Sequence, residues 1–170
     1  MHEEELRMSR LIMTMGLVLF AFTPALAGVD SVELGNTSVD STGGGTVTVT
    51  GNSMSGDLQG YVLCVSHDPA IITLDSIDVL GTDAEVAGAE FVVPTTYADG
   101  GTLGVVLDFN APYDGQSISA GMGLTLANYN YSCNNAVFYT EGDVAPAPET
   151  SALTFVDDVY GSPALSNVFV

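Results

Sequence analysis

The strongest structural signal in the chain is the stretch Thr46-Val47-Thr48-Val49-Thr50. Valine and threonine alternate at every position, and both are β-branched residues that favour an extended backbone. Successive side chains of a β-strand point to opposite faces, so the valines lie on one face and the threonines on the other. The stretch therefore predicts a strand with one face in a core and one face toward water.

Similar short apolar runs follow one another along the chain, separated by Gly, Asp, Asn and Ser, and no useful length has the helical period. Turn signals at this spacing, in a chain of 170 residues, are typical of one sandwich domain. The sequence predicts an all-β fold, a single jelly-roll β-sandwich of about nine strands. The expected strands cover residues 29–34, 46–50, 58–67, 71–80, 89–93, 102–109, 122–131, 136–140, 152–156 and 167–170.

Residues 1–27 have the order of segments that defines a secretory signal peptide. Arg7 and Arg10 precede an apolar stretch at residues 11–22, and an Ala-Leu-Ala cleavage site follows. The apolar stretch is short for a membrane span, although an N-terminal anchor is the alternative. We expect a protein that is secreted or held at the cell surface, with residues 28–170 as its domain and no membrane span after signal cleavage.

The charge of the chain is strongly one-sided, with 21 acidic residues against two basic ones and a formal net charge of −19. Both arginines and three of the acids lie in the predicted signal peptide, so 18 acids and no Lys or Arg remain after cleavage. Nucleic-acid binding needs a basic surface, which excludes that class of function. The charge indicates a protein suited to saline water, or one whose carboxylates bind a cation; plain solubility is the simpler explanation.

No residue pattern indicates catalysis. Ser66, His67 and Asp68 lie in the order of a hydrolase triad, but adjacent strand residues point to opposite faces and cannot align as a triad requires. His67 is expected on an apolar face instead. The sequence has no phosphate loop, zinc motif or EF-hand loop, so we expect a protein that is not an enzyme.

Calcium is the one metal that the sequence suggests as a cofactor. Ca²⁺ prefers oxygen ligands, and carboxylates cluster at Asp75, Asp78, Asp83 and Glu85. A second cluster of carboxylates consists of Glu141, Asp143, Asp157 and Asp158. Neither cluster has a recognised ligand spacing, so solvated acidic loops are the alternative.

Tyrosines offer a second kind of binding surface. Tyr129 and Tyr131 alternate with asparagines and so share one face of a strand. An outward face would make them a strip for stacking sugars, whereas an inward face would make them part of the core. The remaining tyrosines weighed for this role are Tyr97, Tyr113, Tyr139 and Tyr160.

Cys64 and Cys133 are the two cysteines of the chain. An even number of cysteines in a secreted protein predicts one disulfide between them. Such a bond would restrict the unfolded chain and stabilise the fold by roughly 3–4 kcal/mol in the entropic model.

Several segments resemble the cohesin family. Residues 58–74, LQGYVLCVSHDPAIITL, are similar to the pattern in which a cohesin strand ends in Tyr-Asp-Pro before a hydrophobic Val-Leu run. GTLGVVLDF at residues 101–109 resembles a later cohesin strand. Further similar segments are ISAG at residues 118–121, the apolar residues 124–127, Thr154-Phe155 and residues 167–170.

This resemblance implies a non-catalytic nine-stranded jelly roll that binds dockerin modules and so assembles extracellular enzymes or surface proteins. In the matched strand, alternate residues would face the core and the others would face outward on the dockerin-binding sheet. The inward set is Tyr61, Leu63, Val65 and His67, and the outward set is Gly60, Val62, Cys64 and Ser66. The resemblance also implies that Cys64 and Cys133 lie on neighbouring strands of one sheet.

We expect the partner to contact Gly60, Val62 and Ser66 on this strand and Asn110 and Tyr113 in a later loop. Many cohesins carry Asn and Asp where this chain has Gly60 and Val62, a departure that concerns dockerin binding more than the fold. The prediction is a secreted interaction module for a dockerin-type or other extracellular protein. A carbohydrate-binding module and a structural surface or adhesin domain are the alternatives. The chain ends inside a β-like run, so we expect a C-terminal truncation or further modules.

Overall fold

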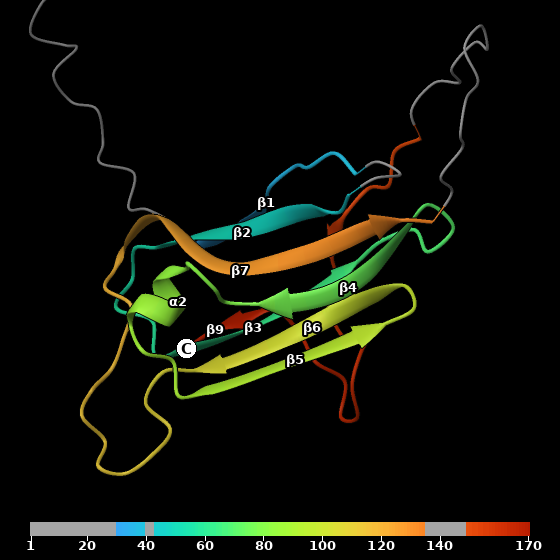
Figure 1. The fold of residues 1–170 in the computed structure, drawn as a ribbon. Helices are drawn as coiled ribbons and strands as arrows, with labels where there is room; N and C mark the ends of the chain where they lie inside the picture. Colours follow the sequence, from blue (N-terminus) through green and yellow to red (C-terminus); the bar gives the residue numbers. More distant parts are fainter. Residues whose placement is uncertain (1–29, 40–42, 135–148) are drawn as a thin grey trace, which may run out of the picture.

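A computed structural model describes residues 30–39, 43–134 and 149–170. These residues form two antiparallel sheets and one short helix (Figure 1). The predicted all-β, sandwich-like character is confirmed. Within the described part, no helix is long and apolar enough to cross a membrane. Three predicted features lie outside the described residues: the signal peptide at 1–27, the strand at 136–140, and the carboxylates Glu141 and Asp143.

The first sheet has the strand order β1-β2-β7-β4. Its long strands are β2 (Gly45–Ser53) and β7 (Gly121–Cys133), which pair along most of their length. β1 (Ser31–Leu34) and β4 (Ile72–Asp78) form its two edges. The predicted alternation in β2 is confirmed, because Val47 and Val49 are buried while the threonines between them are not.

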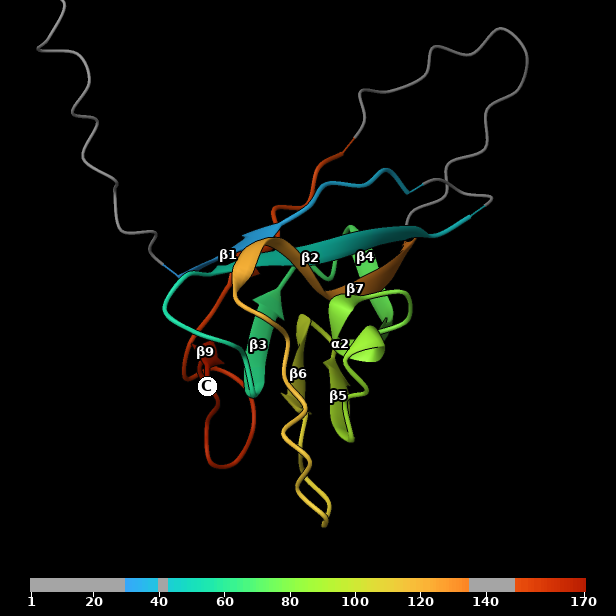
Figure 2. The same ribbon diagram turned by 90° about the vertical axis from the view of Figure 1, so that its left-hand side faces the viewer.

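The second sheet has the strand order β5-β6-β3-β8, and β9 also pairs with β3. Figure 2 shows this sheet beneath the first one. The strands are β5 (Phe91–Tyr97), β6 (Gly100–Val106), β3 (Gly60–Ser66), β8 (Thr154–Phe155) and β9 (Val168–Phe169). β3 is therefore an inner strand, with β6 on one side and both short C-terminal strands on the other.

The core lies between the two sheets. Each sheet sends alternate apolar side chains inward, and burial of this surface is the main stabilising contribution to a fold of this kind. A buried hydrogen bond also joins the layers, since the Tyr61 hydroxyl donates to the carbonyl of Leu126 at 2.6 Å. The fully buried large side chains include Tyr61, Leu63, Val65, Leu103, Val105, Leu126, Tyr129 and Tyr131.

Two elements differ from the sequence prediction. We expected the strand at 89–93 to end at Pro94, but β5 continues through Pro94 to Tyr97. Proline cannot donate to a ladder, and β5 tolerates it because it is an edge strand bonded to β6 alone. The helix α2 (Asp83–Val86) was not predicted; Thr82 caps it by accepting a hydrogen bond from the Glu85 N–H.

Candidate interaction surface

At one end, the outward side of the second sheet is apolar. Because side chains alternate along β3, inward Tyr61 and Leu63 leave Val62 on the outer side. Strand register aligns Val62 with Gly104 of β6 and Val168 of β9, and Gly104 with Val93 of β5. We call this surface the open face; it consists of Val62, Phe91, Val93, Gly104, Val106 and Val168, with Phe109 from the loop after β6.

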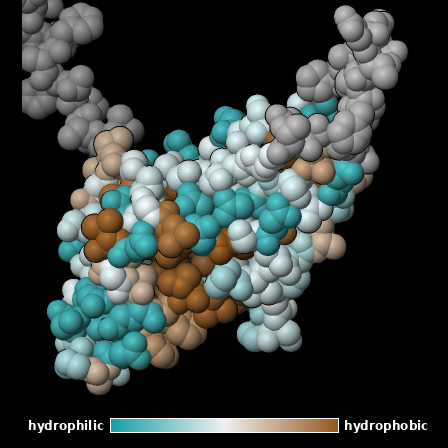
Figure 3. Space-filling model, in the orientation of Figure 1, coloured by the Kyte–Doolittle hydropathy of each residue, from teal (hydrophilic) through white to brown (hydrophobic). Residues whose placement is uncertain are grey.

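The open face is exposed to solvent to an unusual degree for apolar side chains. Exposed fractions are 41% for Phe91, 42% for Val93, 51% for Phe109 and 46% for Val168. Figure 3 looks at the edge of the sandwich formed by β4 and β5, where hydrophobic residues also gather at the surface. Contiguous exposed apolar surface of this kind marks sites of interaction.

The aromatic end of the open face is held in place by a carboxylate. The rings of Phe91 and Phe109 stack at a centroid distance of 4.7 Å and an interplanar angle of 26°. The Glu90 carboxylate accepts hydrogen bonds from the backbone N–H groups of Phe109, at 2.8 Å, and of Asn110. A partner would therefore meet aromatic rings that are already ordered, which lowers the entropic cost of binding.

Gly104 lies at the centre of the open face, between Val62 and Val93. A Cβ atom built on Gly104 would have no heavy atom within 4 Å. The space over Gly104 is therefore open, with a valine on either side. We call this space the recess; it leaves room for an apolar side chain of a partner.

The other half of the outer side is covered by the segment between β8 and β9. Gly100 faces outward opposite Ser66, and a Cβ on Gly100 would collide with the Tyr160 hydroxyl of this segment. The Tyr97 ring stacks on the Tyr160 ring at 4.6 Å. Cys64 faces the same way and is fully buried, while its backbone N–H donates to the Asn167 side chain at 2.7 Å.

The residues predicted to bind a partner divide between these two halves. Val62 lies on the open face and is half-buried, and Gly60 lies at its end, opposite Val106. Ser66 lies at the covered end and contacts the Thr154 carbonyl. Asn110 and Tyr113 are exposed in the loop between β6 and β7, which projects away from both sheets (Figure 2). The alternation of β3 located this side of the sheet, but nothing in the sequence singled out Phe91, Val93 and Phe109.

The four carboxylates predicted to bind calcium lie in β4 and α2. The described residues contain no group of three or more His, Cys, Asp or Glu side chains that could hold a metal ion. Each carboxylate instead accepts hydrogen bonds from protein donors. Asp75 accepts from Ser132, Asp78 from Asn128 and Asn130, Asp83 from Thr125, and Glu85 from the Gly81 N–H.

The predicted disulfide is corrected by the structure, in which Cys64 and Cys133 are both free thiols. Cys64 lies in β3 of the second sheet, whereas Cys133 ends β7 of the first sheet. The two strands are therefore not neighbours, contrary to what the cohesin resemblance implied. Burial raises the pKa of the Cys64 thiol, with a smaller contribution from the nearby Asp157 carboxylate.

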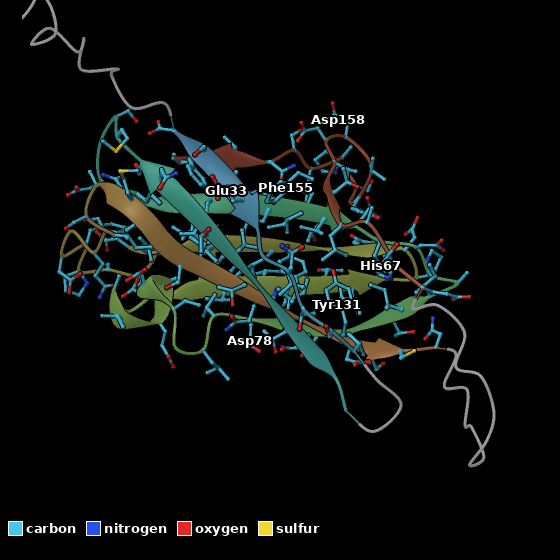
Figure 4. All side chains as sticks on the ribbon, turned by 90° about the horizontal axis from the view of Figure 1, so that it is seen from above. Glu33, His67, Asp78, Tyr131, Phe155 and Asp158 are labelled. Atoms are coloured by element: carbon cyan, nitrogen blue, oxygen red, sulfur yellow. The ribbon has the colours of Figure 1, made fainter. Side chains whose placement is uncertain are left out.

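The predicted sugar-binding strip of Tyr129 and Tyr131 is part of the core, with exposed fractions of 0% and 1%. His67 lies against Tyr131, with the ring centroids 5.4 Å apart in an edge-to-face arrangement (Figure 4). The expected apolar environment of His67 is confirmed, and Ser66 makes its contact with Thr154 rather than with the histidine. Burial lowers the pKa of His67, although the carboxylates of Asp99 and Asp68 oppose this effect.

The outer side of the first sheet is entirely different in chemistry from the open face. Hydroxyl, amide and carboxylate groups of β2, β7 and β4 bond to one another across the strands. Thr48 donates to Asn128 at 3.1 Å, and Asn128 donates onward to Asp78 at 3.2 Å. Because these groups satisfy one another, this side of β2, β7 and β4 is polar.

Neither protein-family models nor curated proteins gave a match to this sequence. Functional assignment therefore depends on the residues and their geometry.

Proposed function

We propose that this chain is a secreted, non-catalytic interaction module of cohesin-like type, with a jelly-roll arrangement of its strands and a signal peptide at its N-terminus. Its partner is an extracellular protein, either of the dockerin type, as the cohesin resemblance implies, or of another type. The partner docks on the open face and reaches the projecting loop that carries Asn110 and Tyr113. The two-sheet, all-β architecture is compatible with this proposal.

The observation that carries the proposal is the exposed apolar half of the second sheet. Protein interfaces have apolar and aromatic centres with polar rims, and the stacked pair of Phe91 and Phe109 fits such a centre. Carbohydrate binding is the weaker alternative, because the paired tyrosines that suggested it are buried and Tyr113 is a single exposed ring.

The test is capture of secreted proteins on the immobilised protein, compared between two matched variants. Val93→Asp places a charge on the open face, and Val86→Asp places the same charge on α2, where Val86 is 83% exposed. We expect a partner that is captured by the wild type and by Val86→Asp but is lost with Val93→Asp. Circular dichroism checks that both variants are folded.

Two outcomes would count against the proposal. Capture that is equal for all three proteins would remove the open face from the interaction. A bound polysaccharide in place of a protein would favour the carbohydrate-binding alternative. Loss of the captured protein on chelation of Ca²⁺ would be the result expected for a dockerin-type partner.

A further inference from the structure

We infer that the partner of the open face presents an apolar side chain surrounded by Lys and Arg, and is not a second copy of this chain. This inference deepens the proposed function and rests on it. The argument has two parts, the shape of the open face and the charge around it.

Every charged side chain in the described residues near the open face is a carboxylate. Glu90 lies beside the stacked rings, where it bonds the backbone of Phe109, and Asp108 is the residue before Phe109. Asp157 accepts hydrogen bonds from the backbone N–H and side chain of Asn167, immediately before Val168. Because the described residues contain no Lys or Arg, nothing within them neutralises this rim.

A rim of one sign selects its partner by complementarity. Opposite charges across an interface speed association and stabilise it, whereas facing like charges cost several kcal/mol. Two copies of this chain would bring identical acidic rims together, and the whole chains carry −19 each. A basic partner is attracted by the same field over about 10 Å at 0.1 M salt.

The recess at Gly104 supplies the apolar part of the recognition. A side chain placed over Gly104 would contact Val62 and Val93 on either side, and the aromatic pair lies at one end of the same surface. An apolar contact alone would not distinguish this partner from others, and charge alone would not orient it. The two together select a cationic, amphipathic surface.

Two synthetic peptides provide the probe: an amphipathic helix of Leu and Lys, and a peptide of equal charge with Ser in place of Leu. Binding to the secreted protein is followed by fluorescence anisotropy. We expect the Leu/Lys peptide to bind about tenfold more tightly than the Ser/Lys peptide, since burial of apolar surface is the difference between them. Raising the salt from about 0.05 M to about 0.5 M should weaken the Leu/Lys peptide by a similar factor.

Matched variants locate the binding. Phe109→Ser should weaken the Leu/Lys peptide by roughly tenfold and Glu90→Gln by a few-fold, because the glutamine keeps an acceptor oxygen but not the charge. Val86→Ser on α2 and Glu33→Gln on β1 are the controls, and both should bind as the wild type does; both residues are exposed and neither belongs to the open face.

The inference is wrong if the two peptides bind equally, if salt has no effect, or if Phe109→Ser binds as its control does. A concentration-dependent dimer that Val93→Asp abolishes would assign the face to a second copy instead. The proposed function is tested separately: a captured protein that needs Val93 but is insensitive to salt and to Glu90→Gln would overturn the inference and leave the function intact.

Discussion

Two glycines of β6 occupy opposite environments, although they are only four positions apart. A Cβ on Gly100 would collide with the Tyr160 hydroxyl and the Val65 carbonyl, whereas a Cβ on Gly104 would meet nothing within 4 Å. We expect Gly100→Ala to lower the free energy of unfolding by about 1–3 kcal/mol, as overpacking does. Gly104→Ala should change it by less than about 0.5 kcal/mol. Urea unfolding of both variants checks this, and equal effects would contradict the covered and open halves of the sheet.

Buried tyrosine hydroxyls provide a second matched pair. The register of β7 skips Leu126 at a bulge, so Leu126 has no paired residue in β2, and its carbonyl accepts from Tyr61. Tyr61→Phe should cost about 1–2 kcal/mol, because it leaves that buried carbonyl without this donor. The Tyr131 hydroxyl is buried without a hydrogen-bond partner, so Tyr131→Phe should be neutral or stabilising. Thermal unfolding distinguishes the two, and a cost for Tyr131→Phe as large as that for Tyr61→Phe would contradict this account.

His67 makes the stability depend on pH. Its pKa is lowered by burial from 6.5, so below that pH the unfolded chain takes up a proton that the folded chain does not. The contribution of His67 to the free energy of unfolding is therefore fully present above pH 6.5. It decreases as the pH falls toward the lowered pKa and does not change further below that pKa. We expect His67→Phe to have a flatter stability profile than the wild type between pH 7 and pH 5. Parallel profiles would show that His67 is protonated equally in both states.

At the scale of elements, the sequence predicted strands well and their neighbours poorly. Alternation at residues 46–50 located β2 and its buried face, because period two follows from local backbone geometry. Which strands pair is decided by long-range packing, which a single strand does not encode. The cohesin resemblance implied that Cys64 and Cys133 lie on adjacent strands, but they lie in different sheets. The burial of Cys64 under the covering segment is likewise a long-range contact that the sequence of β3 does not encode. The helix α2 has a local signal, because Thr82 and Glu85 have the spacing of a capping box.

The covering segment between β8 and β9 gives the thiols different accessibilities. Cys64 is fully buried beneath it, whereas Cys133 is half-buried at the end of β7. Without reductant, we expect Ellman's reagent to find one reactive thiol in the folded protein and two after denaturation. Tyr160→Ala should make Cys64 reactive in the folded state, because it removes a ring that packs over this side of the sheet. If the denatured protein has no reactive thiol, Cys64 and Cys133 are joined by the disulfide that the sequence predicted.

At the scale of the whole molecule, carboxylates replace salt bridges as the polar ties between segments. Asp30 accepts from the backbone N–H groups of Met54 and Ser55, and Asp57 accepts from that of Ala120. Hydrogen bonds from Ser55 and Met54 lower the pKa of Asp30, and hydrogen bonds from Asn167 lower the pKa of Asp157. These carboxylates favour the folded state above their ordinary pKa of 3.8, and this contribution is lost as the pH falls through the lowered values.

The same carboxylates repel one another, since the described residues hold no Lys or Arg to oppose them. Added salt screens this repulsion and should raise the melting temperature steadily from low ionic strength to about 1 M, where the Debye length is about 3 Å. Screening depends on ionic strength, whereas a binding site for calcium would respond to that ion alone. We therefore expect CaCl₂ and NaCl at matched ionic strength to stabilise the protein equally, because the predicted ligands Asp75, Asp78, Asp83 and Glu85 are each engaged by separate donors. An excess stabilisation by Ca²⁺ that saturates at micromolar to millimolar concentration would mean that these carboxylates, or others in the chain, do gather around the ion.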